Sequence, residues 1–356
     1  MIARLLRSVA FFGAGALTAT VVGAVNGWSG DEAADAPAVA SVPSPSSSAP
    51  SSSAPSSSAP PSSAPPSSAP SSSAPPSSAP PSSAPPSSAA AQPCPATTPS
   101  DMVCVPGGEF VRGIDVARAR RLGDKHLRST PSSTVVVSTF LLDRTEVTVA
   151  DWRACVAEGA CRKEAGPLYA DFDAPRQPIH GVSWFDAVAF CTARGKRLPT
   201  EAEWEKAARG TDGRMFPWGD EPATCARAVY RNEAGRSCGV KQRSPKNADV
   251  GRPEPVGSRP ADPAGTFDLA GNSWEWVNDW FSPTWSACGA ACAGIDPRGP
   301  CGGAAACPGH TERVVRGGSW YWPADHMATW FRRPHVPTNA PVFHHFGFRC
   351  ARSLAP

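Results

Sequence analysis

Residues 178–210 read PIHGVSWFDAVAFCTARGKRLPTEAEWEKAARG, and this stretch contains the start and stop signals of two short helices. Ser183 and Thr200 each stand three residues before a carboxylate, which is the spacing of a capping box that satisfies backbone N–H groups at a helix start. Gly195 and Gly210 follow as helix-ending residues. The stretch therefore predicts two consecutive helices joined by a tight connection.

The same start signal occurs upstream at Thr148, where a third helix is expected to run to Gly159. In the helix after Ser183, Trp184 and Cys191 share a face, so the cysteine is predicted to point into the core. The glutamates of the helix after Thr200 are interpreted as a solvated first turn in which negative charge favours the helix dipole. These are Glu201, Glu203 and Glu205.

Strand candidates are few and short, at residues 102–113, 134–148 and 311–321. Most of residues 210–310 shows neither helical nor strand periodicity and is rich in glycine, proline and single tryptophans. This part predicts long irregular loops that are held by disulfides and aromatic packing.

The N-terminal third cannot contribute to a core. Arg4 and Arg7 precede an uncharged segment with a hydrophobic central region, so residues 1–30 predict an export signal. Two alternatives stay open: cleavage after the small residues near Ala24, or retention of residues 8–25 as a membrane anchor, which we favour. Residues 31–93 are dominated by Ser, Ala and Pro and predict a disordered tether. We therefore expect an extracytoplasmic location: the periplasm, the cell surface or the medium.

Residues 94–356 are the predicted folding unit, which is long enough for one large domain. Its 32 basic and 28 acidic residues give a formal charge of +4 without a basic stripe, which argues against nucleic acid as a partner. All 12 cysteines lie in this unit. An even number of cysteines in an exported chain favours a disulfide-bearing fold.

Within this unit, motifs follow one another in a fixed order: MVCVPGGEFVRG, FLLDRTEVTVADW, the stretch at 178–210, FPWGDE, FDLAGNSWEWVNDWF, RVVRGGSW and GFRCAR. This series resembles the formylglycine-generating enzyme or sulfatase-modifying factor domain family, from Met102 to Arg352. The resemblance implies an α+β fold, a variant of the C-type-lectin-like fold that has low regular secondary structure and is rich in disulfides.

The resemblance also implies a chemistry, copper-dependent oxidation of a sulfatase cysteine to formylglycine. In the enzymes, two cysteines shortly after the Gly-Gly-Ser triplet bind copper(I), and the matching positions here are Trp322 and Met327. No cysteine lies between Cys307 and Cys350. Thiolates select copper(I), an indole cannot replace them, and a thioether is a neutral single contact, so copper is not expected.

Other pocket positions of the family are retained or changed. Trp274 and Ser319 match pocket residues, whereas His345 stands where the family has an asparagine. A replacement metal centre built from His326, His344, His345 and Met327 is one hypothesis. The opposing interpretation is that adjacent His344 and His345 point in opposite directions, so that at most one faces the cleft.

Family members that bind calcium use positions that fall here on Asp268, Leu269, Gly271 and Ser273. Calcium prefers oxygen ligands of this kind. The alternative is that the acidic groups only cap and solvate a tight turn. A second family calcium site begins with an asparagine, at which this chain has Val229.

The cysteines are assigned a structural role. The resemblance implies a Cys191–Cys350 disulfide. Positions along the chain favour three more pairs: Cys155 with Cys161, Cys225 with Cys238, and Cys94 with Cys104. Four cysteines remain in one loop, with three connectivities open, and a zinc site at the first two is the alternative to disulfides. They are Cys288, Cys292, Cys301 and Cys307.

These observations favour a non-enzymatic binding or scaffold module whose cleft recognises a peptide, a glycan or an envelope component. A cluster of aromatic and basic side chains is the predicted recognition surface, although about half of its rings are expected in the core. It comprises Trp320, Tyr321, Trp322, Trp330, Phe331, Arg332 and Arg333. There are two alternatives. One is a formylglycine-generating-type oxidase with altered metal ligands, and the other is a structural stalk protein whose function depends on the tether and not on the folded domain.

Overall fold

The computed structural model describes residues 92–167, 169–241 and 251–354. The predicted export signal, the anchor at residues 8–25 and all but the last residues of the tether lie outside them. Among the residues that are described, no helix has both the length and the apolar character needed to cross a membrane.

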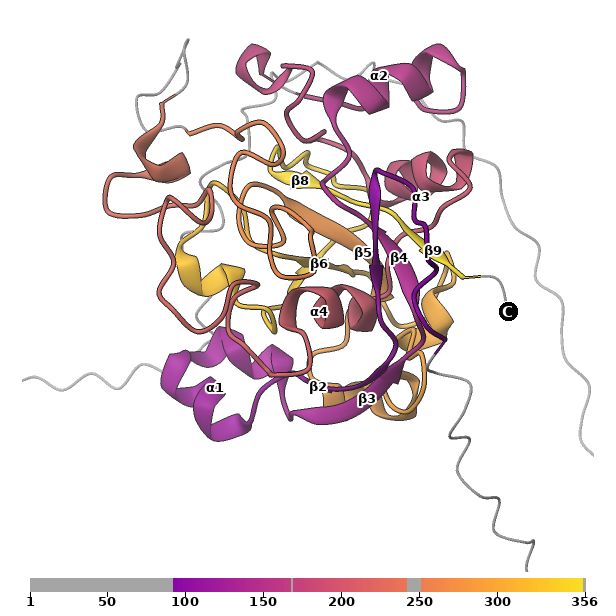
Figure 1. The fold of residues 1–356 in the computed structure, drawn as a ribbon, viewed down its shortest axis with the longest axis vertical. Helices are drawn as coiled ribbons and strands as arrows, with labels where there is room; N and C mark the ends of the chain where they lie inside the picture. The colour runs from indigo at the N-terminus through magenta and orange to yellow at the C-terminus, as the bar shows by residue number, and fades with distance from the viewer. Residues whose placement is uncertain (1–91, 168, 242–250, 355–356) are drawn as a thin grey trace, which may run out of the picture. The chain divides into compact units, whose positions relative to one another are not determined.

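Three small sheets form the frame of the domain (Figure 1). The first is antiparallel in the order β1-β4-β9, with β1 at Met102–Val105, β4 at Phe140–Asp143 and β9 at Ala351–Ser353. The second pairs β2 (Gly108–Arg112) with β3 (Ser133–Val137). The third has the order β7-β6-β5-β8, with β7 at Arg333–His335, β6 at Arg313–Arg316, β5 at Trp274–Trp280 and β8 at Phe346–Gly347.

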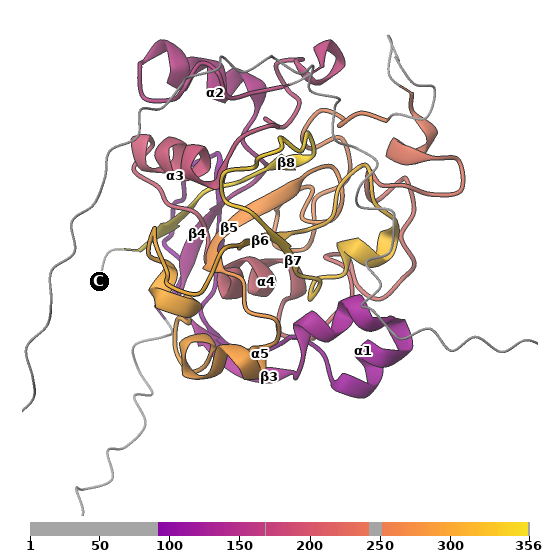
Figure 2. The same ribbon diagram turned by 180° about the vertical axis from the view of Figure 1, so that it is seen from behind.

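Short helices surround these sheets. The α-helices are α1 (Val116–Leu122), α2 (Val149–Ala157), α3 (Trp184–Ala193), α4 (Glu201–Arg209) and α5 (Trp285–Cys288). The 3-10 turns are Asp124–Ser129, Ala170–Phe172, Arg236–Gly239, Gly289–Cys292, Pro300–Gly303 and Ala324–Met327. Helix α4 lies beside β5 and β6, α2 and α3 lie on the side of β8, and α1 lies at the opposite end near β3 (Figures 1 and 2).

The three predicted capping boxes are confirmed at the starts of α2, α3 and α4. In α3, Trp184 and Cys191 are both buried, as their spacing predicted. Helix α1 was not predicted, because its sequence is dominated by arginine and only Ala119 is buried. Its start is nevertheless capped, since Asp115 accepts a hydrogen bond from the backbone N–H of Arg118 at 2.7 Å.

The prediction that the glutamates of α4 are solvated is wrong. Glu201 and Glu205 are buried, and Arg316 reaches both of them, at 3.1 and 2.7 Å. Arg332 adds two further hydrogen bonds to Glu201, at 2.6 and 2.9 Å. Buried carboxylates need such partners because desolvation of an unpaired charge is very unfavourable. The helix is therefore fixed in the core by ion pairs.

All 12 cysteines form disulfides. The four pairs expected from the sequence and the resemblance are present: Cys94–Cys104, Cys155–Cys161, Cys191–Cys350 and Cys225–Cys238. The connectivity left open is Cys288–Cys292 with Cys301–Cys307. The alternative of a zinc site at the first two of these is thus not realised, since their sulfurs are bonded to each other.

Candidate functional site

The loop that follows β6 carries the positions at which the family has its thiolates. Met327, at the second position, is completely buried. Gly318 and Gly271 make room for it, since a Cβ on Gly318 would lie 2.7 Å from its Cγ and a Cβ on Gly271 would lie 3.1 Å from its Sδ. The thioether therefore fills the gap between two glycine-containing loops and has no open face.

Trp322, at the first thiolate position, is half-buried. Its ring stacks on His326 with centroids 4.9 Å apart and planes inclined by 26°. The guanidinium carbon of Arg333 lies 4.8 Å from the centre of the indole. The first thiolate position is thus occupied by an indole packed between an imidazole and a guanidinium.

The remaining pocket residues of the family are also enclosed. Trp274, Ser319 and His345 are buried. The hydroxyl of Ser319 accepts a hydrogen bond from the backbone N–H of Tyr321 at 3.4 Å. Both ring nitrogens of His345 are buried and find no hydrogen-bond partner within the part of the chain that the structure describes. These side chains therefore belong to the core and do not face an open cleft.

The predicted recognition surface is mostly core as well. The rings of Trp320, Tyr321, Trp330 and Phe331 are buried, and so is the Arg332 guanidinium that pairs with Glu201. Among the predicted rings, only Trp322 retains substantial exposure. About half of the five rings were expected in the core, and the structure buries four of them, because they pack within two clusters of buried apolar side chains.

The histidines do not form the hypothesised metal centre. His344 and His345 both contact the ring of Trp320, with centroids 5.7 and 6.5 Å away, so the expectation that they point in opposite directions is wrong. His326 stacks on the ring of Trp322, and the same ring contacts His345, with centroids 6.4 Å apart. Across residues 92–354, outside the two gaps, no three His, Cys, Asp or Glu side chains gather closely enough to hold a metal ion.

The loop predicted to bind calcium places Asp268 beside a buried glutamate from another element. Asp268 adopts a φ of 58° and accepts the backbone N–H of Gly257 at 2.7 Å. The Glu146 carboxyl lies next to it, and its Oε1 accepts the side-chain N–H of Asn272 at 3.1 Å. Its Oε2 is buried and receives no hydrogen-bond donor from any residue that the structure describes.

The two carboxyls of this pair influence each other's protonation. Burial raises the pKa of Glu146, and the Asp268 charge raises it further. Burial also raises the pKa of Asp268. Arg349 is nearby, but its guanidinium is bound to both oxygens of Glu275, at 2.7 and 2.8 Å. The two carboxyls therefore hold either a shared proton or a cation, and with backbone carbonyls they offer the kind of oxygen ligands that calcium prefers.

The other predicted calcium positions follow Asp268 directly in the chain. Leu269, Gly271 and Ser273 lie on the same loop, and the Ser273 hydroxyl donates to the Trp274 carbonyl at 3.0 Å. Val229, which stands where the family's second calcium site begins with an asparagine, pairs with Gly271 through a backbone bridge. Its carbonyl accepts the Asn272 N–H at 2.8 Å. Val229 thus serves backbone pairing.

A model of the sulfatase-modifying factor enzyme 1-like domain matches residues 87–354. The chain belongs to this family. It is 36% identical over 211 residues to the formylglycine-generating enzyme of Thermomonospora curvata, a match that covers 57% of this chain and 64% of that enzyme. It is 33% identical over 310 residues to the formylglycine-generating enzyme of Streptomyces coelicolor, covering 74% of this chain and 93% of the relative.

Another relative is named inactive C-alpha-formylglycine-generating enzyme 2, from Mus musculus, at 30% identity over 305 residues, covering 71% of this chain and 85% of that protein. Among solved structures, PvdO from Pseudomonas aeruginosa has a TM-score of 0.50 at 24% identity and covers 71% of this chain and 94% of its own. Treponema denticola variable protein 1 has a TM-score of 0.51 at 22% identity, with 70% and 94% covered. These structures confirm the predicted fold.

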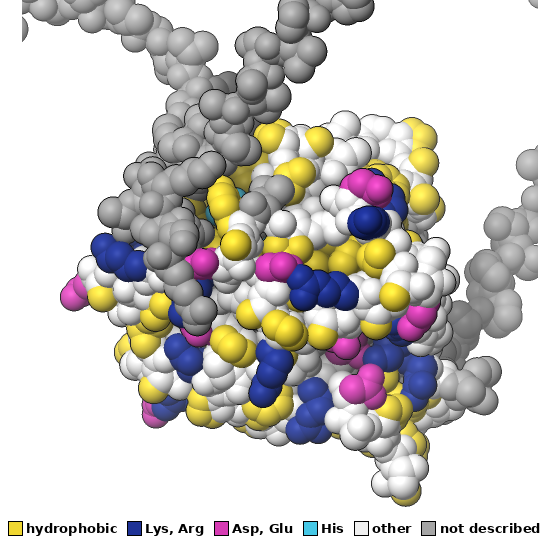
Figure 3. Space-filling view, turned by 90° about the horizontal axis from the view of Figure 1, so that it is seen from above, with side chains coloured by type: hydrophobic (Ala, Val, Ile, Leu, Met, Phe, Trp, Pro, Cys, Tyr) yellow, Lys and Arg dark blue, Asp and Glu magenta, His cyan; other side chains and the backbone are white. Residues whose placement is uncertain are grey.

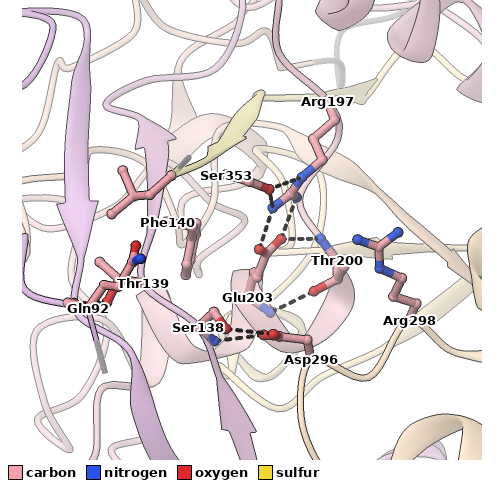
Figure 4. Close-up of a pocket in the computed structure, with 11 residues that line it drawn as sticks. Gln92, Ser138, Thr139, Phe140, Arg197, Thr200, Glu203, Asp296, Arg298 and Ser353 are labelled. Atoms are coloured by element: carbon pink, nitrogen blue, oxygen red, sulfur yellow. Dashed lines mark hydrogen bonds and ion pairs between the residues drawn. The ribbon is translucent and has the colours of Figure 1, made fainter. Parts of the chain in front are cut away.

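Away from the family's thiolate positions, this sulfatase-modifying-factor-like domain has a polar cavity of about 440 Å³ (Figure 4). Arg197 forms two hydrogen bonds of 2.6 Å with Glu203 in its wall. Asp296 accepts the backbone N–H and the hydroxyl of Ser138, at 2.7 and 2.6 Å. Arg298 is exposed, lines the cavity and forms no ion pair with the residues that the structure describes.

Sequence reasoning missed this cavity because its lining comes from separate segments: residues 92, 138–140, 197–203, 296–298 and 353–354.

The face that carries α2 has a mixed surface (Figure 3). Basic, acidic and apolar side chains are interspersed over its visible part, without a large patch of one charge. A groove of about 400 Å³ runs there along α2, with Trp152, Val156 and Ile179 among its lining residues.

Proposed function

We propose that this member of the sulfatase-modifying factor family is an exported, membrane-tethered binding or scaffold module, and that it does not carry out the copper-dependent oxidation. The observation that carries the proposal is the replacement of the thiolate pair by Trp322 and Met327. All 12 cysteines are in disulfides, so no other thiol can take their place. Copper(I) binding of the family's kind requires soft anionic sulfur.

The relatives are consistent with either outcome, because the family includes proteins named as enzymes and one named as inactive. Fold alone therefore does not assign the activity. The proposal depends on the chemistry of two positions, at which an indole and an enclosed thioether cannot supply the charge that the metal needs.

The ligand we propose is a peptide, a glycan or an envelope component, bound in the polar cavity. The predicted aromatic surface is largely buried, so it cannot provide the contact area. The cavity, by contrast, offers an exposed guanidinium at Arg298 and the exposed Ser353 hydroxyl. A concave site with a few placed polar groups is the usual form of a ligand site.

The first test is direct. The purified full chain is incubated with copper and a sulfatase-type Cys-x-Pro-x-Arg peptide, and the products are analysed by mass spectrometry. We expect no aldehyde. Robust conversion of the cysteine would establish the alternative, an oxidase with altered metal ligands, and would overturn the proposal.

The second test concerns binding. The full chain is applied to a glycan array and a peptide array, and the strongest hits are measured again with Arg298→Ala. Arg153→Ala is the matched control, since Arg153 is an exposed arginine that pairs with Asp173 and does not line the cavity. We expect at least tenfold weaker binding for Arg298→Ala only. Deletion of residues 37–91, which spares Gln92 in the cavity wall, should leave the affinity unchanged, whereas a stalk protein would lose its function.

We also propose that Glu146 and Asp268 hold a structural calcium ion with backbone carbonyls of the loop at residues 269–273. The support is that Oε2 of Glu146 is buried, receives no donor from another group among the described residues, and lies within hydrogen-bond reach of the second carboxyl. Calcium would supply the positive charge that these two groups lack. The other explanation is a proton shared between the carboxyls, which the raised pKa of both would also allow.

The two explanations predict different responses. With calcium, the melting temperature of the EGTA-treated full chain rises on addition of calcium, and bound terbium is sensitised by tryptophan. Glu146→Gln abolishes both effects, whereas Glu158→Gln, an exposed control on the α2 side, retains them. With a shared proton, calcium has no effect and Glu146→Gln is stabilising at neutral pH. That result would refute the calcium proposal.

A further inference from the structure

The loop at residues 293–300, here called the cavity loop, contributes two opposite charges to the polar cavity. Asp296 and Arg298 stand two positions apart on it, and both line the cavity. The loop is fixed to β3, since the backbone N–H of Asp296 donates to the Val136 carbonyl at 2.8 Å. One short disulfide lies just before it and another just after it: Cys288–Cys292 and Cys301–Cys307. The two charges are therefore presented from an anchored backbone.

The Asp296 carboxylate is held by neutral groups. Oδ1 accepts the backbone N–H of Ser138 at 2.7 Å, and Oδ2 accepts the Ser138 hydroxyl at 2.6 Å (Figure 4). Within the part of the chain that the structure describes, this carboxylate forms no ion pair. A carboxylate has about four acceptor positions, so Asp296 can accept further hydrogen bonds from a ligand.

The cavity contains two guanidinium groups, and only one of them is bound by the protein. Arg197 forms two hydrogen bonds with Glu203 and two more with the Ser353 hydroxyl, at 3.1 and 3.0 Å. Arg298 is exposed and has neither Asp296 nor any other described carboxylate as an ion-pair partner. Arg298 is therefore the guanidinium that can receive an anionic group of a ligand.

The Ser353 hydroxyl adds a neutral donor to the cavity wall. Its oxygen accepts both hydrogen bonds from Arg197, and it donates none to the residues that the structure describes. A serine hydroxyl carries one proton that rotates to suit its partner. Because Ser353 is exposed, that proton can be donated to a carbonyl or carboxylate oxygen of a ligand.

These charges restrict the kind of ligand that fits. Arg197 and Glu203 neutralise each other, so Arg298 and Asp296 remain as one positive and one negative group. A neutral glycan would leave both without a counter-charge. A polyanion would match Arg298 but would bring negative charge close to Asp296 and Glu203, which is unfavourable. A ligand that carries one charge of each sign matches both groups.

We propose that the cavity binds a short unblocked peptide, whose carboxylate pairs with Arg298 and whose ammonium group pairs with Asp296. This inference rests on the proposed function, because it takes the cavity to be the ligand site. The planar guanidinium matches a carboxylate through two parallel N–H bonds. An extended tripeptide spans about 10 Å. A cavity of about 440 Å³ is within the usual size range of ligand sites.

The test begins with changes to the ligand, which leave the protein untouched. Binding of trialanine to the full chain is measured by calorimetry at neutral pH and low ionic strength. Trialanine is the probe because its methyl side chains need no pocket of their own. The same peptide is then measured with an acetylated N-terminus and with an amidated C-terminus. We expect each block to weaken binding about tenfold, because each removes one charge-assisted contact.

Changes to the protein then assign each contact. Arg298→Ala should weaken unblocked trialanine about tenfold and leave the already weak amidated peptide unchanged, since both changes remove the same interaction. Asp296→Asn, which keeps an oxygen for the Ser138 N–H, should weaken the unblocked peptide and leave the acetylated one unchanged. Arg153→Ala is the matched control outside the cavity and should bind all three peptides as the unmodified chain does.

The proposal is wrong if unblocked trialanine does not bind at millimolar concentration, or if neither block weakens it. It is also wrong if a galacturonate trisaccharide binds more tightly than trialanine and loses its affinity in Arg298→Ala, because the ligand would then be an acidic glycan. These results would leave the proposed function intact, since that requires only a ligand whose binding depends on Arg298. Aldehyde formation in the copper assay would overturn the proposed function instead.

Discussion

Acid should destabilise this protein through a histidine that is fully enclosed. His180 has no exposed surface, contacts Phe172 at a centroid distance of 6.0 Å, and has no hydrogen-bond partner on either ring nitrogen among the described residues. Burial, with the charge of His344 adding to it, lowers its pKa from 6.5 to about 3. The folded protein therefore binds a proton at His180 far less readily than the unfolded chain does.

The magnitude follows from the two pKa values. The contribution of the neutral side chain is fully present above the unfolded value of about 6.5 and is lost as the pH falls toward the folded value. From pH 7 to pH 5 the free energy of unfolding should fall by about 2 kcal/mol on account of this one group. Since pH 5 lies above the folded value of about 3, the loss depends mainly on the ordinary pKa of histidine.

The assay compares the full chain with its His180→Phe variant, disulfides intact, by guanidinium denaturation at both pH values. We expect the unmodified chain to lose about 2 kcal/mol more than the variant between pH 7 and pH 5. Other groups titrate as well: burial raises the pKa of Asp279 to about 7, which stabilises the fold as the pH falls. Such contributions are common to both proteins and cancel in the difference.

The reasoning is refuted if both proteins show the same dependence on pH. The baseline effect of the phenylalanine does not matter, because only the change with pH is compared. His180→Leu, which removes the titrating group with a smaller side chain, should give the same difference and guards against a packing artefact.

Three further changes test the packing of the former thiolate site and of α4, each by chemical denaturation of the full chain. Met327→Ala should cost roughly 2–5 kcal/mol because it empties a fully buried position, and an unchanged midpoint would contradict that packing. Gly318→Ala should cost more than about 1 kcal/mol, since φ is 74° and its Cβ would lie 2.7 Å from Met327 Cγ. Combining it with Met327→Ala should recover part of that loss. Arg316→Met should cost about 3 kcal/mol because it removes one ion pair from each of two buried carboxylates, Glu201 and Glu205, and a loss below about 1 kcal/mol would argue against the network.

The parts of the fold that sequence predicted are those in which the deciding contacts are local. The capping boxes at Ser183 and Thr200 involve residues three positions apart, so the pattern is visible in the chain itself. The prediction that the glutamates of α4 are solvated was wrong because Arg316, which binds both Glu201 and Glu205, follows more than 100 residues later. No local pattern records such a pairing.

The candidate sites show the same division. The resemblance drew attention to Trp322 and Met327, because identity at a motif position can be read from the chain. It could not show that Met327 is wedged between Gly271 and Gly318. Glu146 was missed as a neighbour of Asp268 for the same reason: they are brought together only by tertiary packing.

The disulfides differ greatly in span, and this has a practical consequence for the intact molecule. Five of them close loops of 4 to 13 residues, whereas Cys191–Cys350 joins positions 159 apart and encloses the elements from α4 to β8. A single proteolytic cut anywhere in the enclosed chain would leave both fragments covalently linked. A nicked protein would then migrate as one species without a reducing agent and as two with it, so cleavage in an extracellular environment need not release any part of the domain.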